Sequence, residues 1–322
     1  MSGEKTQAYR VLDLVRSEIT PFTYFPNETD RDALVAGIAS GLHPLLNGEP
    51  GGGKTSIAKA LAQSMDVSFG RHQGDPRSDT RHILGTRIFD QETNSYRFLE
   101  GPIFNNILLA DEANRDNPGT QAAYIEAMQE KQVTTMDGVK RPLPDFFRVI
   151  ATQNYADETE GINLLTDANT DRFGFLLDLS KPYDEEDLLK VKLIRDKWQL
   201  TGGPSAVVNE KDMVAAERAI MSIEQDADPD RTRHAQFLVM SVRNHPDVDA
   251  NESILNKARP TLQMLQLACG LCALENSVTL QESQINTAAP YVLGHRTRLT
   301  NSAIQEGKTP ASVIAEVVAN YA

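Results

Sequence analysis

Short apolar runs alternate with stretches of helical periodicity over the first part of the chain. The runs have the length and composition of buried strands, and the stretches between them place apolar residues every three or four positions, as helices do. Strands that alternate with helices predict a layered α/β sheet. We place the end of this domain at residue 181, just before Pro182. The predicted strands include residues 45–46, 107–110, 149–151 and 175–177.

Helical periodicity dominates from residue 182 onward, which predicts an all-helical domain over residues 182–322. Asp184 is the predicted N-cap of its first helix, because its side chain can accept from the first turn and acidic residues follow it. The charged run 226–231 is predicted to be a solvated loop. Further helices are predicted to begin near Lys211, Gln236, Pro260 and Glu282.

Composition narrows the classes of function. Asp and Glu number 45 against 32 Lys and Arg, a formal charge of -13, which argues against nucleic acid as the main partner. No apolar run is long enough for a membrane span and the first residues carry no apolar signal, so we expect no membrane insertion. The 322 residues include two cysteines, which favours a reducing, cytoplasmic location.

These two cysteines, Cys269 and Cys272, have the C-x-x-C spacing of redox and metal sites. They lie at helical spacing with Leu262 and Leu265, on an apolar stripe without a second pair of ligands nearby. We therefore predict that they pack in a core.

The most specific motif is a complete G-x-x-x-x-G-K-[ST] string between a predicted strand and a predicted helix. Backbone N–H groups of such a turn surround phosphate oxygens, and the helix N-terminus adds a favourable dipole. In that role the lysine meets the β- and γ-phosphates and the threonine ligates Mg²⁺. A glycine turn without a ligand is the alternative, and Pro44 suits the preceding strand only as its first residue. The predicted nucleotide-binding residues are Gly48, Glu49, Pro50, Gly51, Gly52, Gly53, Lys54, Thr55 and Ser56.

Two later strand ends supply the remaining chemistry. Asp111 and Glu112 follow an apolar run, as expected if Asp111 holds Mg²⁺ through water and Glu112 polarises the attacking water. Residues 152–154, Thr-Gln-Asn, end the next strand, where an amide could hydrogen-bond the water or the γ-phosphate. An ordinary turn is the alternative there.

The assembled pattern resembles the MoxR family of AAA+ ATPases from about Asp32 to Leu299. The similarity is carried by EGPIF (100–104), LLADEANR (108–115), TQ (120–121), EAMQE (126–130), IATQN (150–154), DRF (171–173) and VLGHR (292–296). It implies a AAA+ P-loop core, with a parallel five-stranded sheet between helices, and a C-terminal all-helical lid. It also implies an ATP-hydrolysing ring, usually a hexamer, that binds ATP with Mg²⁺ between subunits.

The resemblance also assigns roles to three polar residues. Asn154 is expected as sensor 1, Arg172 as the arginine finger that reaches a neighbouring subunit, and Arg259 as sensor 2 of the lid. Arg115 is a competing candidate for the contact between subunits, and a surface pair with a nearby aspartate is the alternative for Arg172. The string around Arg259, NKARP, departs from the family's usual GASPR-like string, so Lys257 is an alternative to Arg259.

Two hairpin insertions are predicted in the first domain, at about residues 85–100 and 131–146. In similar AAA+ proteins such hairpins line or cap the central pore, and exposed edge hairpins without a function are the alternative. Asp-Gly at residues 137–138 favours the tight reversal of the second hairpin.

The function that the resemblance implies is that of a chaperone or remodeller, which assembles protein complexes or loads them with metal. A protein client is expected, reached through a von Willebrand A domain partner. A nucleic-acid motor stays open because Lys140 and Arg141 lie on the second hairpin, and a nucleotide-dependent scaffold without hydrolysis is the other alternative. The sequence leaves ATP against GTP, the client and the ring stoichiometry open.

Overall fold

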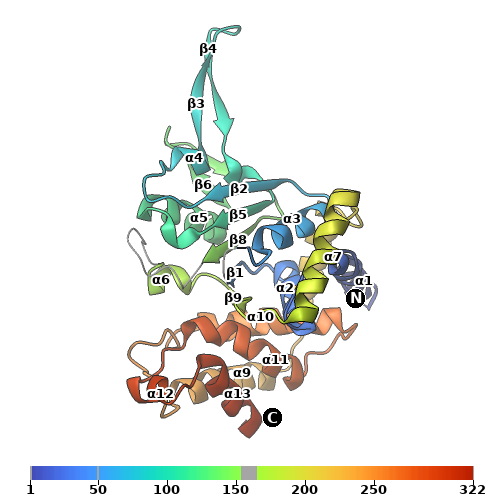
Figure 1. The fold of residues 1–322 in the computed structure, drawn as a ribbon, viewed down its shortest axis with the longest axis vertical. Coiled ribbons are helices and arrows are strands. Elements are labelled where there is room, and N and C mark those ends of the chain that lie inside the picture. Colours follow the sequence, from blue (N-terminus) through green and yellow to red (C-terminus); the bar gives the residue numbers. More distant parts are fainter. Residues whose placement is uncertain (1, 49–50, 154–164, 322) are drawn as a thin grey trace.

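The computed structural model describes residues 2–48, 51–153 and 165–321 (Figure 1). Its central sheet is parallel, in the order β2–β5–β8–β1–β9, which confirms the five-stranded parallel sheet. Pro44 is the first residue of β1, where the missing N–H is tolerated. The strands are β1 Pro44–Asn47, β2 Phe69–Gln73, β5 Ile107–Asp111, β8 Arg148–Gln153 and β9 Phe175–Asp178.

β2 is the strand that the hydrophobic pattern did not reveal. It is an edge strand paired with β5, and its exposed Arg71 and Gln73 alternate with buried Gly70 and His72. Phe69 is its one large apolar side chain. A strand without an apolar run leaves little hydrophobic signal, although its alternation of burial is that of a half-buried strand.

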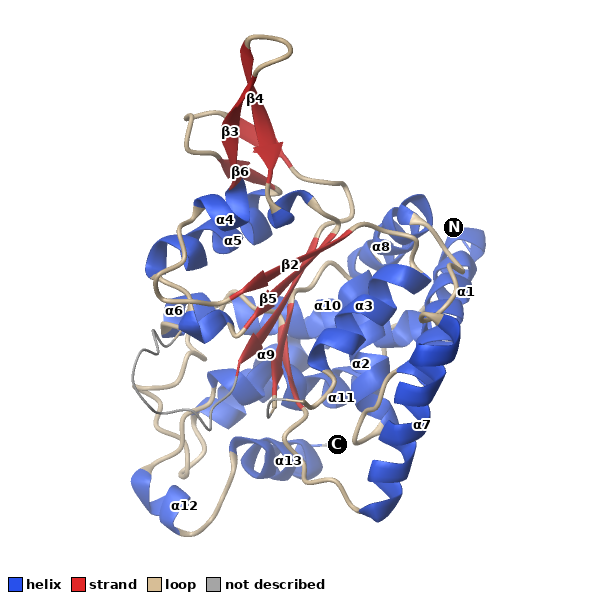
Figure 2. Cartoon of the chain, turned by 45° about the horizontal axis from the view of Figure 1, so that its top comes forward, coloured by secondary structure: helices blue, strands red, loops and turns tan. Residues whose placement is uncertain are grey.

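Helices cover both faces of the sheet (Figure 2). Leu46, Leu109 and Ile150 belong to the hydrophobic cluster that includes α1, α2 and α3, whereas Leu45 and Leu108 belong to the cluster with α4 and α5. Neighbouring strand residues thus enter opposite layers, as the pleat requires. The helices of this part are α1 Ser2–Ile19, α2 Glu28–Ala39, α3 Lys54–Ser64, α4 Arg81–Leu84, α5 Pro118–Glu130 and α6 Asp167–Thr170.

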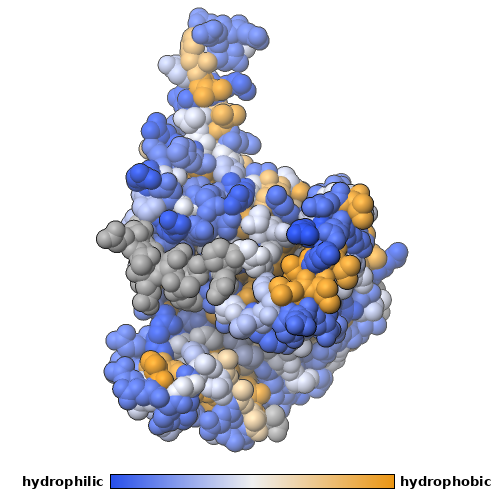
Figure 3. Space-filling model, viewed as in Figure 1, coloured by the Kyte–Doolittle hydropathy of each residue, from blue (hydrophilic) through white to orange (hydrophobic). Residues whose placement is uncertain are grey.

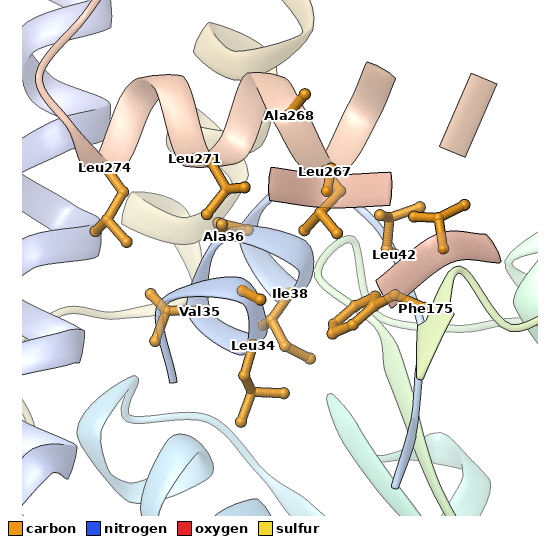
Figure 4. Close-up of a cluster of buried hydrophobic side chains, with 14 of the residues drawn as sticks. Leu34, Val35, Ala36, Ile38, Leu42, Phe175, Leu267, Ala268, Leu271 and Leu274 are labelled. Atoms are coloured by element: carbon orange, nitrogen blue, oxygen red, sulfur yellow. The ribbon is translucent and has the colours of Figure 1, made fainter. Parts of the chain in front are cut away.

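The described residues after 182 contain helices and one isolated β-bridge. α10 packs against α1 and α2, and Figure 4 shows its leucines facing the side chains of α2. Helices from both parts therefore share one hydrophobic cluster, and the division at residue 181 stays a prediction. The helices of this part are α7 Glu185–Thr201, α8 Glu210–Gln225, α9 Pro229–Arg243, α10 Arg259–Leu274, α11 Glu282–Leu293, α12 Asn301–Gln305 and α13 Pro310–Tyr321.

Local signals in this helical part are mostly confirmed, with one error. Asp184 caps α7 in a capping box with Asp187, and both cysteines of α10 are fully buried in the core cluster, as predicted. The loop predicted at residues 226–231 is correct up to Asp228 and wrong beyond it, because Asp228 caps α9 and Pro229 opens it. Pro at the first position and Asp at the N-cap both favour the start of a helix, and these signals were outweighed by the charge of the run.

Two antiparallel hairpins extend from the α/β part. β3 (Gly85–Asp90) pairs with β4 (Ser95–Glu100) and projects beyond the sheet (Figure 1). β6 (Gln132–Thr134) pairs with β7 (Lys140–Pro142). The guanidinium of Arg141 stacks on the Phe98 ring, 4.0 Å from its centroid, so the two hairpins touch. Their place at a pore stays a prediction.

No helix among the described residues is long and apolar enough to cross a membrane.

Candidate nucleotide-binding site

The glycine turn lies between β1 and α3. Gly51 and Gly53 have φ angles of 87° and 77°, values that favour glycine, although a Cβ at either position would meet open space. Lys54 begins α3, and its Nζ donates to the carbonyl oxygen of Gly48. The predicted residues Glu49 and Pro50 lie outside the described residues.

A cavity of about 350 Å³ joins this turn to the ends of three strands. The hydroxyl Oγ1 of Thr55 lies 3.4 Å from Oδ2 of Asp111, although 56 positions separate them in sequence. The structure therefore brings the glycine turn and the acidic pair to one place. The cavity is lined by Gly51, Gly52, Gly53, Lys54, Thr55, Ser56, Arg71, Gln73, Asp111, Glu112, Thr152 and Gln153.

The donor set suits Mg²⁺ that arrives with a nucleotide. Thr55 and Asp111 offer hard oxygen ligands at the mouth of one cavity. Mg²⁺ is commonly held by one or two protein oxygens together with substrate phosphates. Over residues 2–48, 51–153 and 165–321 there is no group of three or more His, Cys, Asp or Glu that could hold a metal without such help.

Thr152 fixes both acidic residues, a role that the sequence did not reveal. Its fully buried hydroxyl donates to Oδ1 of Asp111 at 2.7 Å and accepts from the backbone N–H of Glu112 at 2.8 Å. Glu112 has a φ of 54°, in the left-handed region that non-glycine residues rarely adopt. These hydrogen bonds stabilise a strained backbone that sets the direction of the Glu112 carboxylate.

The end of β8 offers a hydrogen-bond donor to the cavity. The amide Nε2 of Gln153 is buried and has no partner among the described residues. Buried amides are normally paired, so an unpaired one beside a cavity fits a ligand with acceptor oxygens, such as a phosphate. Asn154, the expected sensor 1, lies outside the described residues.

Two arginines hold the acidic pair. Arg115 Nη1 donates to Glu112 Oε2 at 2.9 Å, and Arg71 Nη2 donates to Asp111 Oδ2 at 2.7 Å. Arg71 and its neighbour Gln73 were missed because β2 was missed. The available signal was the alternation of Arg71 and Gln73, which lie on the strand paired with β5.

Arg172 and Arg259, like Arg115, do not line this cavity. Arg172 donates from Nη1 to the carbonyl of Ala168 and pairs with neither nearby aspartate. Arg259, at the start of α10, pairs with Asp171. Within one chain the structure thus keeps both away from the glycine turn, and their roles as arginine finger and sensor 2 stay predictions.

A second cavity of about 280 Å³ shares Gly51–53 and Ser56 with the first. Aromatic rings from the segment after α1 and from the region of α7 line it, together with Arg195. Flat apolar walls beside a phosphate site suit a nucleoside base. No local pattern marks these residues, since they come from distant segments; they are Phe22, Tyr24, Tyr183 and Trp198.

Comparisons with known proteins agree with this geometry. Residues 43–175 match the family described as "ATPase family associated with various cellular activities (AAA)", and residues 251–317 match the AAA lid domain. The uncharacterized protein YeaC of Bacillus subtilis is 33% identical over 286 residues, 89% of this chain and 86% of that protein.

Two further similarities complete the picture. The chaperone MoxR1 of Mycobacterium tuberculosis is 38% identical over 156 residues, 48% of this chain but 41% of that protein. A crystal structure from Cytophaga hutchinsonii, described as a "putative ATPase", has a TM-score of 0.86 at 27% identity and covers 99% of this chain and 97% of its own. The chain belongs to the MoxR family of AAA+ ATPases.

Proposed function

We propose that this protein binds ATP with Mg²⁺ and hydrolyses it, as a ring that uses the cycle to remodel a protein client. The observation that carries the proposal is the meeting of Lys54, Thr55, Asp111 and Glu112 around one cavity. The adjoining aromatic cavity supports a nucleoside triphosphate rather than a smaller phosphate compound.

The residues divide the work as follows. Lys54 and the backbone of the glycine turn bind the phosphates, and Thr55 with Asp111 would hold Mg²⁺, which neutralises charge on the β- and γ-oxygens. Glu112 accepts a proton from the attacking water, and the Gln153 amide donates to the γ-phosphate or to that water. Asn154 is proposed to share this last task as sensor 1.

A ring explains two features of the chain. Arg172 lies outside its own cavity, so we assign it to the cavity of a neighbouring copy, where it would neutralise charge on the γ-phosphate. α7 has no buried residue, and apolar atoms are exposed over it (Figure 3). Exposed apolar surface of this kind marks interfaces. The exposed leucines are Leu188, Leu189, Leu193 and Leu200.

The finer identity rests on the family resemblance. We propose a homohexamer in the cytoplasm that acts in assembly or metal-loading of protein complexes, with a von Willebrand A domain protein as its partner. The name of one relative, chaperone MoxR1, supports a protein as the client. The nucleic-acid alternative loses one of its two basic residues, because Arg141 pairs with Asp137 at 3.0 Å and stacks on Phe98; Lys140 is exposed.

The decisive test combines two inactive variants. Glu112→Gln and Arg172→Ala are each expected to bind ATP but not to turn it over, and Lys54→Ala is expected not to bind. Because a mixed ring pairs intact Glu112 of one subunit with intact Arg172 of the next, an equal mixture should restore about a quarter of the active interfaces. Lys59→Ala is the control, because Lys59 is exposed on α3, the helix that begins at Lys54.

No ATP turnover in the wild type would contradict hydrolysis and leave a scaffold. Wild-type turnover in the Glu112→Gln variant would contradict the role of Glu112 as the base. Full turnover of Arg172→Ala, or no recovery on mixing, would contradict a trans-acting arginine. A pull-down with Glu112→Gln held in ATP then identifies the client. Capture of nucleic acid alone would refute the protein client.

A further inference from the structure

The guanidinium of Arg71 lines the nucleotide cavity and forms an ion pair with Asp111 there. Arg71 donates to Oδ2 of Asp111 from Nη2 at 2.7 Å and from Nε at 3.1 Å. Thr55 Oγ1 lies 3.4 Å from the same oxygen. A metal ion held by Thr55 and Asp111, directly or through water, would depend on this carboxylate as well, so the guanidinium and the metal share one partner.

The strand register places Arg71 at this point. Gln73 lies opposite Asp111 in the β2–β5 ladder, and Arg71, two positions earlier, lies on the same face of β2. The Oε1 of Gln73 accepts from Arg71 Nη2, which orients the guanidinium towards the carboxylate.

The two partners of the ion pair differ in exposure. The Arg71 side chain is 47% exposed, whereas that of Asp111 is 11% exposed and is also fixed by Thr152. The carboxylate therefore stays in place, while the arginine is free to withdraw into the cavity or into solvent. An ion pair of this exposure is weak enough to be exchanged.

We propose that Arg71 competes with Mg²⁺ for Asp111 and thereby sets how strongly nucleotide binding depends on the metal. The inference rests on the proposed function, because it takes the metal to arrive with ATP. Without Arg71 the carboxylate loses this ion pair, so Mg²⁺ strengthens nucleotide binding more than it does in the wild type.

The test measures binding and needs no turnover. The dissociation constant of a fluorescent, non-hydrolysable ATP analogue is measured in EDTA and in saturating Mg²⁺. The constant in EDTA divided by the constant in Mg²⁺ measures the coupling between metal and nucleotide. Arg71→Gln is expected to raise this ratio about fivefold, equivalent to about 1 kcal/mol. Arg81→Gln, which removes the same charge from a surface pair with Asp79, is expected to leave it unchanged.

A second variant, Gln73→Leu, removes the acceptor that orients Arg71 and is expected to raise the ratio by less. A ratio at or below the wild-type value in either variant overturns the proposal. A higher ratio that arises solely because the variant binds the analogue more weakly in EDTA also overturns the proposal, since it would show a lost contact between Arg71 and the phosphates. Equal binding of the analogue by wild type and Lys54→Ala would instead refute the proposed nucleotide site itself.

Discussion

The buried ion pair of Asp171 and Arg296 gives the sharpest test of how the two parts of the chain are joined. Both side chains are fully buried, and Arg296 Nε donates to Asp171 Oδ1 at 3.1 Å. Arg296 also donates from Nη2 to the backbone carbonyls of Asp171 at 2.8 Å and Phe173 at 2.9 Å. Burial lowers the pKa of Arg296 to about 10, and the Asp171 carboxylate opposes that change. At neutral pH the arginine is charged.

Arg296→Met keeps much of the side-chain volume but removes the charge and all these donors. Removal of one partner of a buried pair costs about 3–5 kcal/mol, because the other charge is left buried. Arg259 still pairs with Asp171, so we expect about 3 kcal/mol, a loss of roughly a hundredfold in the folding equilibrium. Arg298→Met, two residues along, breaks an exposed pair with Asp167 and is expected to cost at most about 1 kcal/mol.

The assay is urea unfolding at pH 7, followed by far-UV circular dichroism, for the wild type and both variants. The expected order of midpoints is wild type, then Arg298→Met slightly below it, and Arg296→Met well below both. If Arg296→Met lies within 1 kcal/mol of Arg298→Met, the buried pair does not hold the two parts together and the reasoning fails.

Three further predictions follow from close contacts and one buried histidine. A Cβ at Gly74 would lie 2.2 Å from the carbonyl oxygen of Glu112, so Gly74→Ala should displace the backbone of Glu112. Turnover in a steady-state assay should fall by about a hundredfold while the ATP analogue still binds, and unchanged turnover would contradict this. Burial, aided by the charge of Arg148, lowers the pKa of His43 to about 3, so the unfolded state binds its proton first as pH falls below about 6.5. Stability should therefore fall by about 1.3 kcal/mol between pH 7 and 5.5 on account of His43, and urea unfolding of His43→Asn should show that much less loss. A Cβ at Gly270 would lie 2.5 Å from a carbonyl oxygen of α2, so Gly270→Ala should lower stability by about 1–3 kcal/mol in thermal unfolding, whereas Gly294→Ala, which meets nothing within 4 Å, should not.

Hydrophobic runs predicted four of the five strands, including β9 at one edge of the sheet, and missed β2 at the other edge. β5 is buried along its whole length, which produces the run at residues 107–110. β2 is buried at alternate positions, and its two buried positions hold Gly70 and His72 rather than large apolar residues. Burial of a glycine leaves no hydrophobic signal, so the strand and the two polar residues that it brings to the cavity were lost together.

Motif spacing predicted the phosphate turn and the acidic pair because each lies within a few consecutive residues. The contacts that complete the site join residues distant in sequence. Thr152 reaches Asp111 across 41 positions, and the aromatic cavity combines Tyr24 with Trp198. No local pattern specifies such pairs, since they depend on the order of strands and on the packing of α7.

The helical part contacts the nucleotide machinery at two separate points, which suggests how one site could act on the next. α7 lines the aromatic cavity beside the glycine turn, so a base bound in that cavity would touch this helix directly. Arg259 of α10 and the buried Arg296 both hold Asp171, the residue before Arg172. If the helical part moves relative to the sheet when the nucleotide changes, the backbone that carries Arg172 must move with it or lose a buried ion pair. The cost of that loss, about 3–5 kcal/mol, exceeds the 1–3 kcal/mol typical of coupling between sites. The segment at Asp171 is therefore stiff enough to carry a change in one cavity to Arg172, the arginine that we propose serves the neighbouring cavity.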